Sequence, residues 1–216
     1  MLEHLPCRDR ASIDSPLALN PLPNSITWSG AIAYLDRDGV LNIGSENYVN
    51  SPSEVILLPQ AGHSVARLRR SGMRIAVVTN QSPIGRGYWD TENLACIHDK
   101  IQELLLMEDK DAILDLILHS PYVPSQNAWA RKPNPGMLEA ARQLIEHAES
   151  SKDWSALSMK FADEWAERPS ESGSVMVGDR FSDMAAADTF GVQSLLCPAE
   201  IGISAVINDI ISPDIQ

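Results

Sequence analysis

The chain has 216 residues, enough for one α/β domain with a sizeable core, or for one domain with a small accessory piece. Its formal net charge of -12 argues against nucleic acid or an anionic membrane as the main partner, and a phosphorylated ligand would need local positive charge. No apolar run approaches the roughly 18 residues of a membrane span. Cys7, Cys96 and Cys197 lie far apart without metal-type spacing, so we expect a cytoplasmic protein without structural disulfides.

The N-terminal part differs in composition from the rest. Residues 1–27 contain several prolines and no clear periodicity, and we expect an extended or mobile tail that packs along the domain. Charged residues such as Arg8 and Asp9 interrupt any apolar segment, which does not fit a signal peptide. Residues 28–216 are expected to form a single domain.

Short apolar runs alternate with amphipathic segments from residue 31 onwards. The runs at 31–35, 73–78, 113–118, 174–177 and 192–197 predict buried strands. The segments at 61–71, about 90–107, about 135–148 and 181–190 predict helices, with Gly72 and Gly191 at two of the ends. Strands that alternate with helices predict an α/β fold with a parallel sheet and right-handed crossovers.

Three segments lie outside this alternation. Residues 43–59 predict a short hairpin or flap, too short for a folded cap domain. Residues 149–173 form a polar insertion that could be a lid, an interface or inert surface, and inert surface is the default expectation. The segment 201–211 is apolar enough to pack back on the domain.

Polar residues gather where three of the predicted strands end. Asp36 and Asp38 follow the first strand, Thr79 and Asn80 end the second, and Asp179 follows the fourth, with Asp183 four residues on. A loop adds Arg131 and Lys132. In a parallel sheet these strand ends lie along one edge, where ligands bind. Asp36 and Asp38 alone would fit a solvated Asp-Gly turn equally well, but three such clusters beside a basic pair predict a site.

These motifs resemble those of the haloacid-dehalogenase (HAD) superfamily of phosphotransferases over about residues 30–197. The matching stretches are Leu35-Asp36-Arg37-Asp38-Gly39-Val40, Val78-Thr79-Asn80-Gln81-Ser82, Arg131-Lys132-Pro133 and Val177-Gly178-Asp179-Arg180-Phe181-Ser182-Asp183. Their finer pattern looks like the D-glycero-D-manno-heptose 1,7-bisphosphate phosphatases, with the histidinol-phosphate phosphatases as the neighbouring branch. The resemblance implies a Rossmann-like, three-layer α/β/α fold with a central parallel sheet, a short flap and no large cap domain.

The resemblance also implies catalytic roles. Asp36 would be the nucleophile that forms an aspartyl-phosphate, and Asp38 would act as acid and then as base. Lys132 would stabilise charge on the transferring phosphoryl group. Mg²⁺ would be held by the Asp36 carboxylate, the Asp38 main-chain carbonyl and Asp179, since this ion prefers oxygen ligands.

Substrate contacts follow from the same resemblance. Thr79 and Asn80 would bind the phosphate, and Arg131 and Arg180 would bind the remainder of the substrate, with a second phosphate as a natural partner. Weaker candidates are Tyr48, Gln81 and Ser82. Three further residues keep two interpretations each. Asp183 could orient Asp179 or Lys132, or be a charge in the first turn of a helix. Arg86 could be a site residue or a solubilising charge, and His119 is expected to be structural rather than a metal ligand.

One loop departs from the family pattern. Many of these phosphatases carry zinc ligands before the Arg-Lys-Pro motif, where this chain has Ser120, Tyr122, Ala128 and Ala130. None of these is a useful zinc ligand, so we expect no zinc and a loop held by Pro121, Pro124, Tyr122 and Trp129 instead.

The sequence therefore predicts a Mg²⁺-dependent phosphatase of carbohydrate metabolism that hydrolyses a small phosphorylated metabolite, preferably D-glycero-D-manno-heptose 1,7-bisphosphate. Histidinol phosphate or another small phosphate ester is the alternative substrate. A catalytically weak binding or regulatory protein on the same scaffold is a second alternative. No nucleic-acid or membrane partner is expected, and the oligomeric state stays open, with a monomer favoured.

Overall fold

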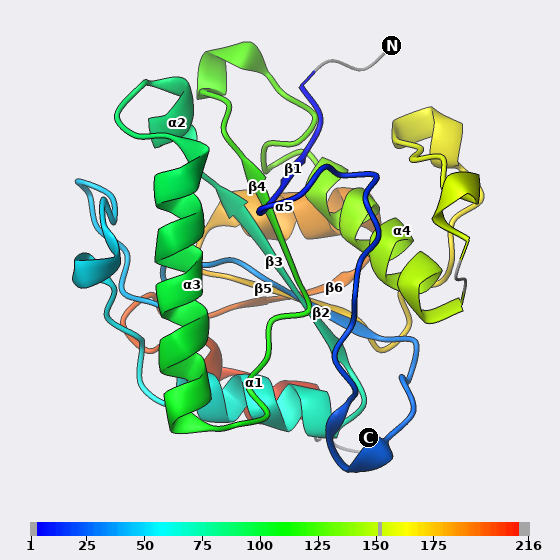
Figure 1. Ribbon diagram of the computed structural model, residues 1–216, viewed down its shortest axis with the longest axis horizontal. Helices are drawn as coiled ribbons and strands as arrows, with labels where there is room; N and C mark the ends of the chain where they lie inside the picture. Colours follow the sequence, from blue (N-terminus) through cyan, green and yellow to red (C-terminus); the bar gives the residue numbers. More distant parts are fainter. Residues whose placement is uncertain (1–3, 151–152, 212–216) are drawn as a thin grey trace.

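A six-stranded sheet lies between two layers of helices in the computed structural model, which describes residues 4–150 and 153–211 (Figure 1). The strands are β1 (Cys7–Arg8), β2 (Ile32–Leu35), β3 (Arg74–Asn80), β4 (Leu116–Ser120), β5 (Val175–Gly178) and β6 (Gln193–Leu196). The helices are α1 (Ala61–Arg70), α2 (Ser82–Gly85), α3 (Thr91–Glu108), α4 (Gly136–Ser150), α5 (Phe181–Phe190) and α6 (Ile207–Ile211). The predicted α/β architecture is confirmed.

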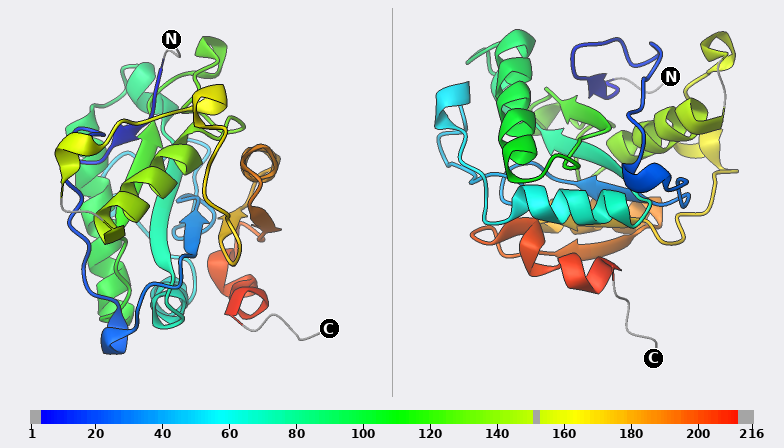
Figure 2. Two further views of the ribbon diagram at one scale, coloured as in Figure 1. Left: turned by 90° about the vertical axis from the view of Figure 1, so that its right-hand side faces the viewer. Right: turned by 60° about the horizontal axis from the view of Figure 1, so that its bottom comes forward.

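The sheet has the order β1-β4-β3-β2-β5-β6, with β2 to β6 all parallel. β2 lies inside the sheet, and all four of its residues are fully buried, as expected of a strand covered on both faces. The helices α1, α3 and α6 cover one face and α4 and α5 cover the other (Figure 2). The carboxyl ends of β2, β3 and β5 therefore lie next to one another.

The N-terminal segment adds an antiparallel edge strand to the expected central parallel sheet. β1 runs antiparallel to β4, with Cys7 opposite His119, and the amide of Asp9 donates to the carbonyl of Ile117 at 3.0 Å. A two-residue strand carries no periodicity, so the sequence pattern could not predict it. The edge of the sheet next to β4 is thus closed by the start of the chain.

The polar insertion, of which residues 149–150 and 153–173 are described, makes more contacts with the domain than expected of inert surface. Phe161 is buried in the core that α4 and α5 share, and Glu171 pairs with the buried Arg142 of α4. Arg168 lies over the ring of Phe190 at the end of α5. These contacts make the insertion an added layer over α4 and α5.

The flap and the C-terminal segment complete the other face. Leu57 of the flap bridges to Asn42, and Ile203 and Ile207 pack in the core beside α1. Within residues 4–150 and 153–211, no helix combines the length and apolar character that crossing a membrane requires.

Candidate active site

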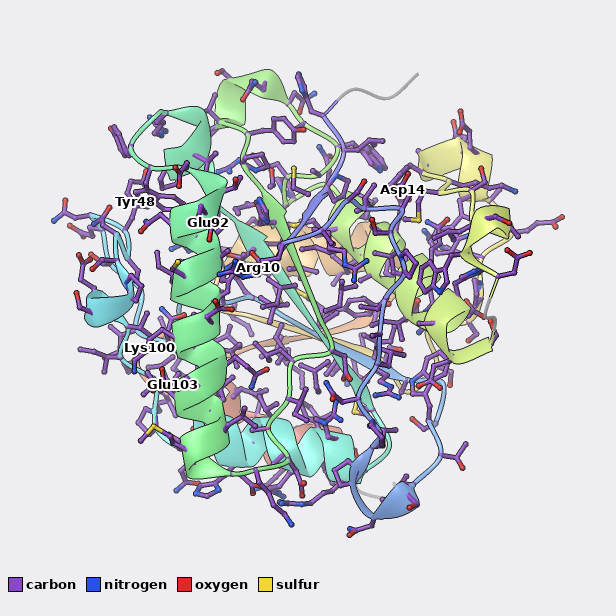
Figure 3. The ribbon with its side chains drawn as sticks, viewed as in Figure 1. Arg10, Asp14, Tyr48, Glu92, Lys100 and Glu103 are labelled. Carbon is purple, nitrogen blue, oxygen red and sulfur yellow. The ribbon has the colours of Figure 1, made fainter. Side chains whose placement is uncertain are left out.

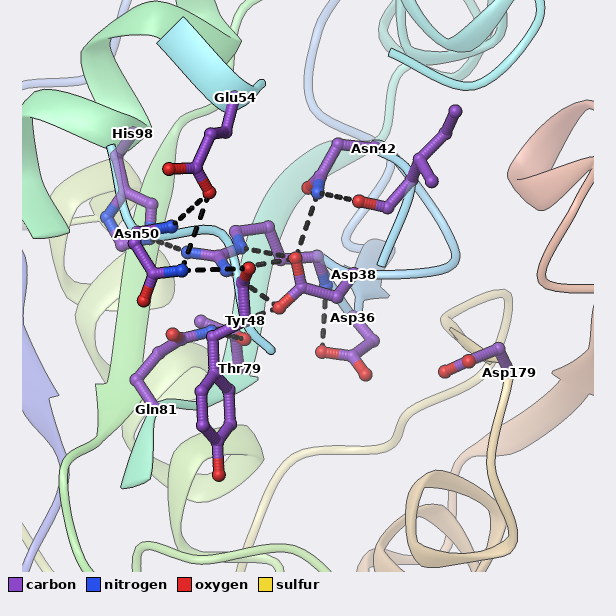
Figure 4. A network of polar contacts seen from close by, with 12 residues as sticks. Asp36, Asp38, Asn42, Tyr48, Asn50, Glu54, Thr79, Gln81, His98 and Asp179 are labelled. Carbon is purple, nitrogen blue, oxygen red and sulfur yellow. Dashed lines mark hydrogen bonds and ion pairs between the residues drawn. The ribbon is translucent and has the colours of Figure 1, made fainter. Parts of the chain in front are cut away.

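The polar clusters predicted from the sequence meet at the carboxyl edge of the sheet. Asp36 follows β2, Thr79 and Asn80 end β3, and Asp179 follows β5. In Figure 4, Asp36 and Asp179 face each other across a gap, with Asp38 beside them in a network of polar contacts. The parallel pairing of β2 with both neighbours brings these residues together, because it sets all three strand ends at one level.

Lys132 joins two of the carboxylates. Its Nζ lies 2.9 Å from Oδ1 of Asp36 and 2.6 Å from Oδ1 of Asp183. All three residues are buried, with exposed fractions of 2%, 7% and 0% in the order Lys132, Asp36 and Asp183. Burial alone would lower the pKa of Lys132, but the charges of Asp36 and Asp183 outweigh it and raise that pKa, so the ammonium stays charged.

The pKa of Asp36 differs from that of an ordinary aspartate. Burial raises its pKa to about 6; the charge of Lys132 opposes this rise, and the charges of Asp183 and Asp38 add to it. Its Oδ1 accepts a hydrogen bond from the Arg37 amide at 2.8 Å as well as the contact from Lys132. Among the described residues, no hydrogen bond or ion pair is made to Oδ2, so this oxygen is free to react or to bind a cation.

Asp179 offers the clearest place for a cation. Oxygens of Asp36, Asp179 and Asp183 lie within 4.8 Å of one another, and Oδ1 of Asp179 is buried without a hydrogen-bond partner in the described part of the chain. A buried, unpaired carboxylate oxygen is costly unless a cation binds it. The residues present therefore fit Mg²⁺, which takes carboxylate oxygens readily.

Gly39 allows Asp179 to come this close to the first strand. It has φ of +80°, and a Cβ at this position would lie 2.5 Å from Oδ2 of Asp179. Any side chain would therefore displace Asp179. Asp183 is engaged elsewhere, because its Oδ2 accepts from the Arg180 amide at 3.0 Å while its Oδ1 contacts Lys132. Its contacts fit an orienting residue, one of the two interpretations left open.

Asp38 is held by a fork of hydrogen bonds. Arg37 donates to it at 2.7–3.1 Å through Nε and Nη2, Asn42 donates at 2.9 Å, and Gln81 donates at 3.3 Å. Burial opposes ionisation here, but the charge and hydrogen bonds of Arg37, together with the two amides, lower the pKa of Asp38. The side chain is therefore fixed in orientation.

The end of β3 supports this arrangement. Asn80 exchanges hydrogen bonds with the main chain of Lys132, accepting at 3.1 Å and donating at 3.0 Å, which positions that lysine. Gln81 donates to the Thr79 hydroxyl at 2.8 Å. Asn80, Gln81 and Ser82 also line the pocket next to Asp38.

That pocket is lined by three arginines and two acidic residues, Asp38 and Glu46, so the balance of its charges is positive. It has a volume of about 270 Å³, and its lining includes Tyr48, Arg86, Arg131 and Arg180. Burial lowers the pKa of Arg131, and the charges of Arg86 and Arg180 lower it further, because like charges lie close together. In the described residues, neither Arg86 nor Arg131 has an acidic partner. A ligand with negative charge would complete this pocket.

The loop that departs from the family pattern is fixed by the start of the chain. The Ala130 amide donates to the carbonyl of His4 at 3.1 Å, and the Tyr122 hydroxyl donates to the carbonyl of Leu5 at 3.2 Å. The carbonyl of Tyr122 in turn accepts from Arg131 at 3.1 Å. Trp129 donates to Glu139 of α4 at 2.7 Å. Ala128 and Ala130 are buried.

Sequence reasoning missed several residues of the site. Arg37, which clamps Asp38, is only 1% exposed, and Asn42 is fully buried. A charged residue inside an Asp-Arg-Asp run directly after a buried strand is the signal that could have identified Arg37. His98 contributes from α3, and no pattern in the sequence connects it to the site.

Comparisons with known proteins identify a family of similar sequence. Residues 129–202 match the family described as HAD-hydrolase-like. A D-glycero-beta-D-manno-heptose-1,7-bisphosphate 7-phosphatase of Pseudomonas putida is 31% identical over 162 residues, 75% of this chain and 79% of its own length. One from Pseudomonas aeruginosa is 40% identical over 119 residues, 55% of this chain. The chain spans 64% of that relative and 56% of one from Bordetella bronchiseptica.

A solved structure gives the same result. D,D-heptose 1,7-bisphosphate phosphatase from B. bronchiseptica, complexed with magnesium and phosphate, superposes with a TM-score of 0.66 at 27% identity. The match covers 85% of this chain and 99% of that one. Fold, site and relatives together show that the chain belongs to the D-glycero-D-manno-heptose-1,7-bisphosphate 7-phosphatase family of HAD-like hydrolases.

Proposed function

We propose that this protein is a Mg²⁺-dependent phosphatase that removes the 7-phosphate of D-glycero-D-manno-heptose 1,7-bisphosphate. The observation that carries the proposal is the buried ion pair of Asp36 and Lys132 beside the unpartnered Asp179 oxygen. The neighbouring Asp38 lines a pocket that also contains three arginines. The relatives are named for this activity, and their names supply the substrate. The cysteines are free thiols, which supports a location in the reducing cytoplasm.

Asp36 acts as the nucleophile. Asp38 is a carboxylate at rest and takes up a proton when the substrate binds. The Oδ2 of Asp36 then attacks phosphorus, the bond from phosphorus to the sugar oxygen breaks, and Asp38 gives that proton to the departing oxygen. Asp38, now ionised, takes a proton from water as that water attacks the aspartyl-phosphate. Inorganic phosphate leaves, and both carboxyl groups return to their starting states. Lys132 holds Asp36 and balances charge on the phosphoryl oxygens throughout.

The carboxylates of Asp36 and Asp179, with the carbonyl of Asp38, would hold Mg²⁺. When bound, this ion supplies positive charge that lets an anionic nucleophile approach an anionic phosphoryl group. Asp183 keeps Lys132 in place and fixes the start of α5 through the Arg180 amide. Gly39 leaves the room that Asp179 needs.

The pocket favours a bisphosphate over histidinol phosphate. Three guanidinium groups face it, and a second phosphate on the sugar would neutralise them through charge-assisted hydrogen bonds. Histidinol phosphate carries an ammonium group instead, and the same arginines would repel it. The distribution of charge therefore selects for a second anion on the substrate.

Phosphate release from a panel of esters with Mg²⁺ tests the proposal. The panel contains heptose 1,7-bisphosphate, other sugar mono- and bisphosphates, and histidinol phosphate. We expect the largest kcat/KM for the heptose bisphosphate, with a product that keeps its 1-phosphate. A preference for histidinol phosphate would contradict the substrate, and no release from any ester would favour a binding protein on this scaffold.

A further inference from the structure

The N-terminal segment, defined here as residues 4–11, lies against the catalytic domain at more places than β1. Arg10 forms ion pairs with two acids of α3, Glu92 at 3.2 Å and Asp99 at 2.6 Å, and Figure 3 shows Arg10 beside Glu92. These ion pairs are exposed. Asp9 makes a second contact between the same segment and the same helix, and its partner is a buried residue.

Asp9 begins a line of polar contacts that ends at Asp38. Its Oδ1 lies 3.0 Å from Nδ1 of His98, and Nε2 of His98 lies 3.5 Å from Nη1 of Arg37. Arg37 then holds Asp38 through its other nitrogens. His98 and Arg37 are only 2% and 1% exposed, so no bulk water competes for these contacts. Figure 4 shows His98 reaching this network from α3.

The donors and acceptors along this line match. A guanidinium can only donate, so Nε2 of His98 must accept, and its proton must therefore sit on Nδ1, facing the Asp9 carboxylate. Burial lowers the pKa of His98, which keeps the imidazole neutral as this pattern requires. The line therefore consists of a carboxylate, a neutral imidazole, a guanidinium and a second carboxylate, with hydrogen bonds in consistent directions.

His98 is what fixes the far side of Arg37. Among the described residues, the Arg37 side chain makes hydrogen bonds to Asp38 and His98 alone. Without His98 the guanidinium would lose its hydrogen bond on the side away from Asp38, and the orientation of the Asp38 carboxylate would depend on Asn42 and Gln81. Asp9 in turn fixes the ring of His98.

We infer that Asp9 and His98 are positioning residues for the acid step, and that the N-terminal segment is thereby part of the catalytic apparatus. The inference rests on the proposed function, in which Asp38 protonates the leaving oxygen. General acid catalysis depends on the position of the acid, and it contributes roughly 10²- to 10⁴-fold to such reactions. A purely structural role, in which Asp9 only fastens the segment to α3, predicts a different kinetic pattern.

The choice of leaving group separates the two roles. A sugar alkoxide needs a proton as it departs, whereas 4-nitrophenolate departs without one. We expect Asp9→Ala to lower kcat/KM for the sugar phosphate about tenfold, a part of the general-acid contribution, and to leave kcat/KM for 4-nitrophenyl phosphate within about twofold. Asp9→Asn, which keeps the acceptor oxygen, should fall between wild type and Asp9→Ala. His98→Leu should repeat the selective loss.

Arg10→Ala is the matched control, since it removes ion pairs between the same segment and the same helix outside this line. It should leave the ratio of the two kcat/KM values at the wild-type level. Equal losses on both esters for Asp9→Ala and Asp9→Asn, or an unchanged ratio, would overturn the inference. Asp9→Asn keeps the test valid if Asp9→Ala does not fold. A wild-type protein inactive on both esters would instead overturn the proposed function, and this inference with it.

Discussion

Two neighbouring regions of the site treat charge in opposite ways. In the buried centre, formed by Asp36, Lys132 and Asp183, the ammonium contacts both carboxylates within 2.9 Å. In the pocket rim, formed by Arg86, Arg131 and Arg180, like charges face one another, and two of the three arginines have no acidic partner among the described residues. The centre is complete in the protein alone, whereas the rim is completed by a ligand.

We therefore assign the reaction to the buried centre and the choice of substrate to the pocket rim. In the proposed function, the centre would contact only the phosphoryl group that reacts, so it would not distinguish one phosphate ester from another. The rim responds to what else the substrate carries. It is also a local reversal of sign in a chain whose net charge is -12, so it attracts anions that the rest of the surface repels. Variants in each region should therefore fail in different ways.

The largest effect is expected for Asp36→Asn, which removes the nucleophile but keeps its shape. Phosphate release should fall more than roughly 10³-fold, as for loss of other covalent nucleophiles. The melting temperature should stay near that of wild type, because Lys132 keeps Asp183 as a partner. Initial rates with Mg²⁺ and a thermal melt check both points. Residual activity near the wild-type rate would contradict the assignment of the nucleophile.

Lys132→Met should damage both activity and stability. It leaves two buried carboxylates without a counter-charge, and breaking a buried ion pair in this way costs about 3–5 kcal/mol. Urea unfolding would measure the loss. Adding Asp183→Asn should recover part of it, because one unpaired charge is then removed. A Lys132→Met protein as stable as wild type would show that the pairing in the centre is not what holds it together.

Asp179→Asn tests the metal ligand by stability, independently of turnover. Mg²⁺ at 100 times its dissociation constant should stabilise the wild-type protein by about 2.7 kcal/mol. We expect most of this gain to disappear in Asp179→Asn, because its buried oxygen no longer carries charge. Asp188→Asn, an exposed change on α5, should keep the gain. Thermal melts with and without Mg²⁺ give the comparison.

The smallest effect is expected in the rim. Arg86→Ala should lower kcat/KM for the bisphosphate about tenfold, which is the loss of one charge-assisted hydrogen bond. The corresponding sugar monophosphate should be affected little. Arg67→Ala on α1, which removes an exposed arginine elsewhere, serves as the control. An equal loss on both substrates would show that Arg86 does not contact the second phosphate.

Much of the fold could be predicted because local patterns decided it. The helix expected over 181–190 has those limits in the structure, where Gly191 ends it with φ of +79°. The strand expected from residue 113 begins instead at Leu116, since Asp115 turns inward to pair with Arg69 and Arg74. A buried ion pair between distant segments leaves no periodic trace in a sequence.

The residues of the candidate site also fall into those that local motifs indicate and those that depend on contacts between distant segments. Asp36, Asp38, Thr79 and Asp179 could be proposed from the sequence because each stands at or just after a strand end within a motif. Asp9 and His98 could not, because the contact between them joins residues 89 positions apart and depends on where α3 lies. Arg86 could not be assigned from the sequence either. The structure shows that it lines a pocket together with Arg131 and Arg180, which distinguishes it from a merely solubilising charge.

The position of β2 inside the sheet affects the order in which the chain can fold during synthesis. β2 can pair with β3 soon after both have been synthesised, but its other edge pairs with β5, which is synthesised much later. The Ile32 amide of β2 donates a hydrogen bond to the Ser174 hydroxyl, 142 residues further along the chain. Contacts of such long separation form late. Asp179 and Asp183 follow β5, so a growing chain contains Asp36 and Lys132 well before it gains these two acidic residues of the candidate site.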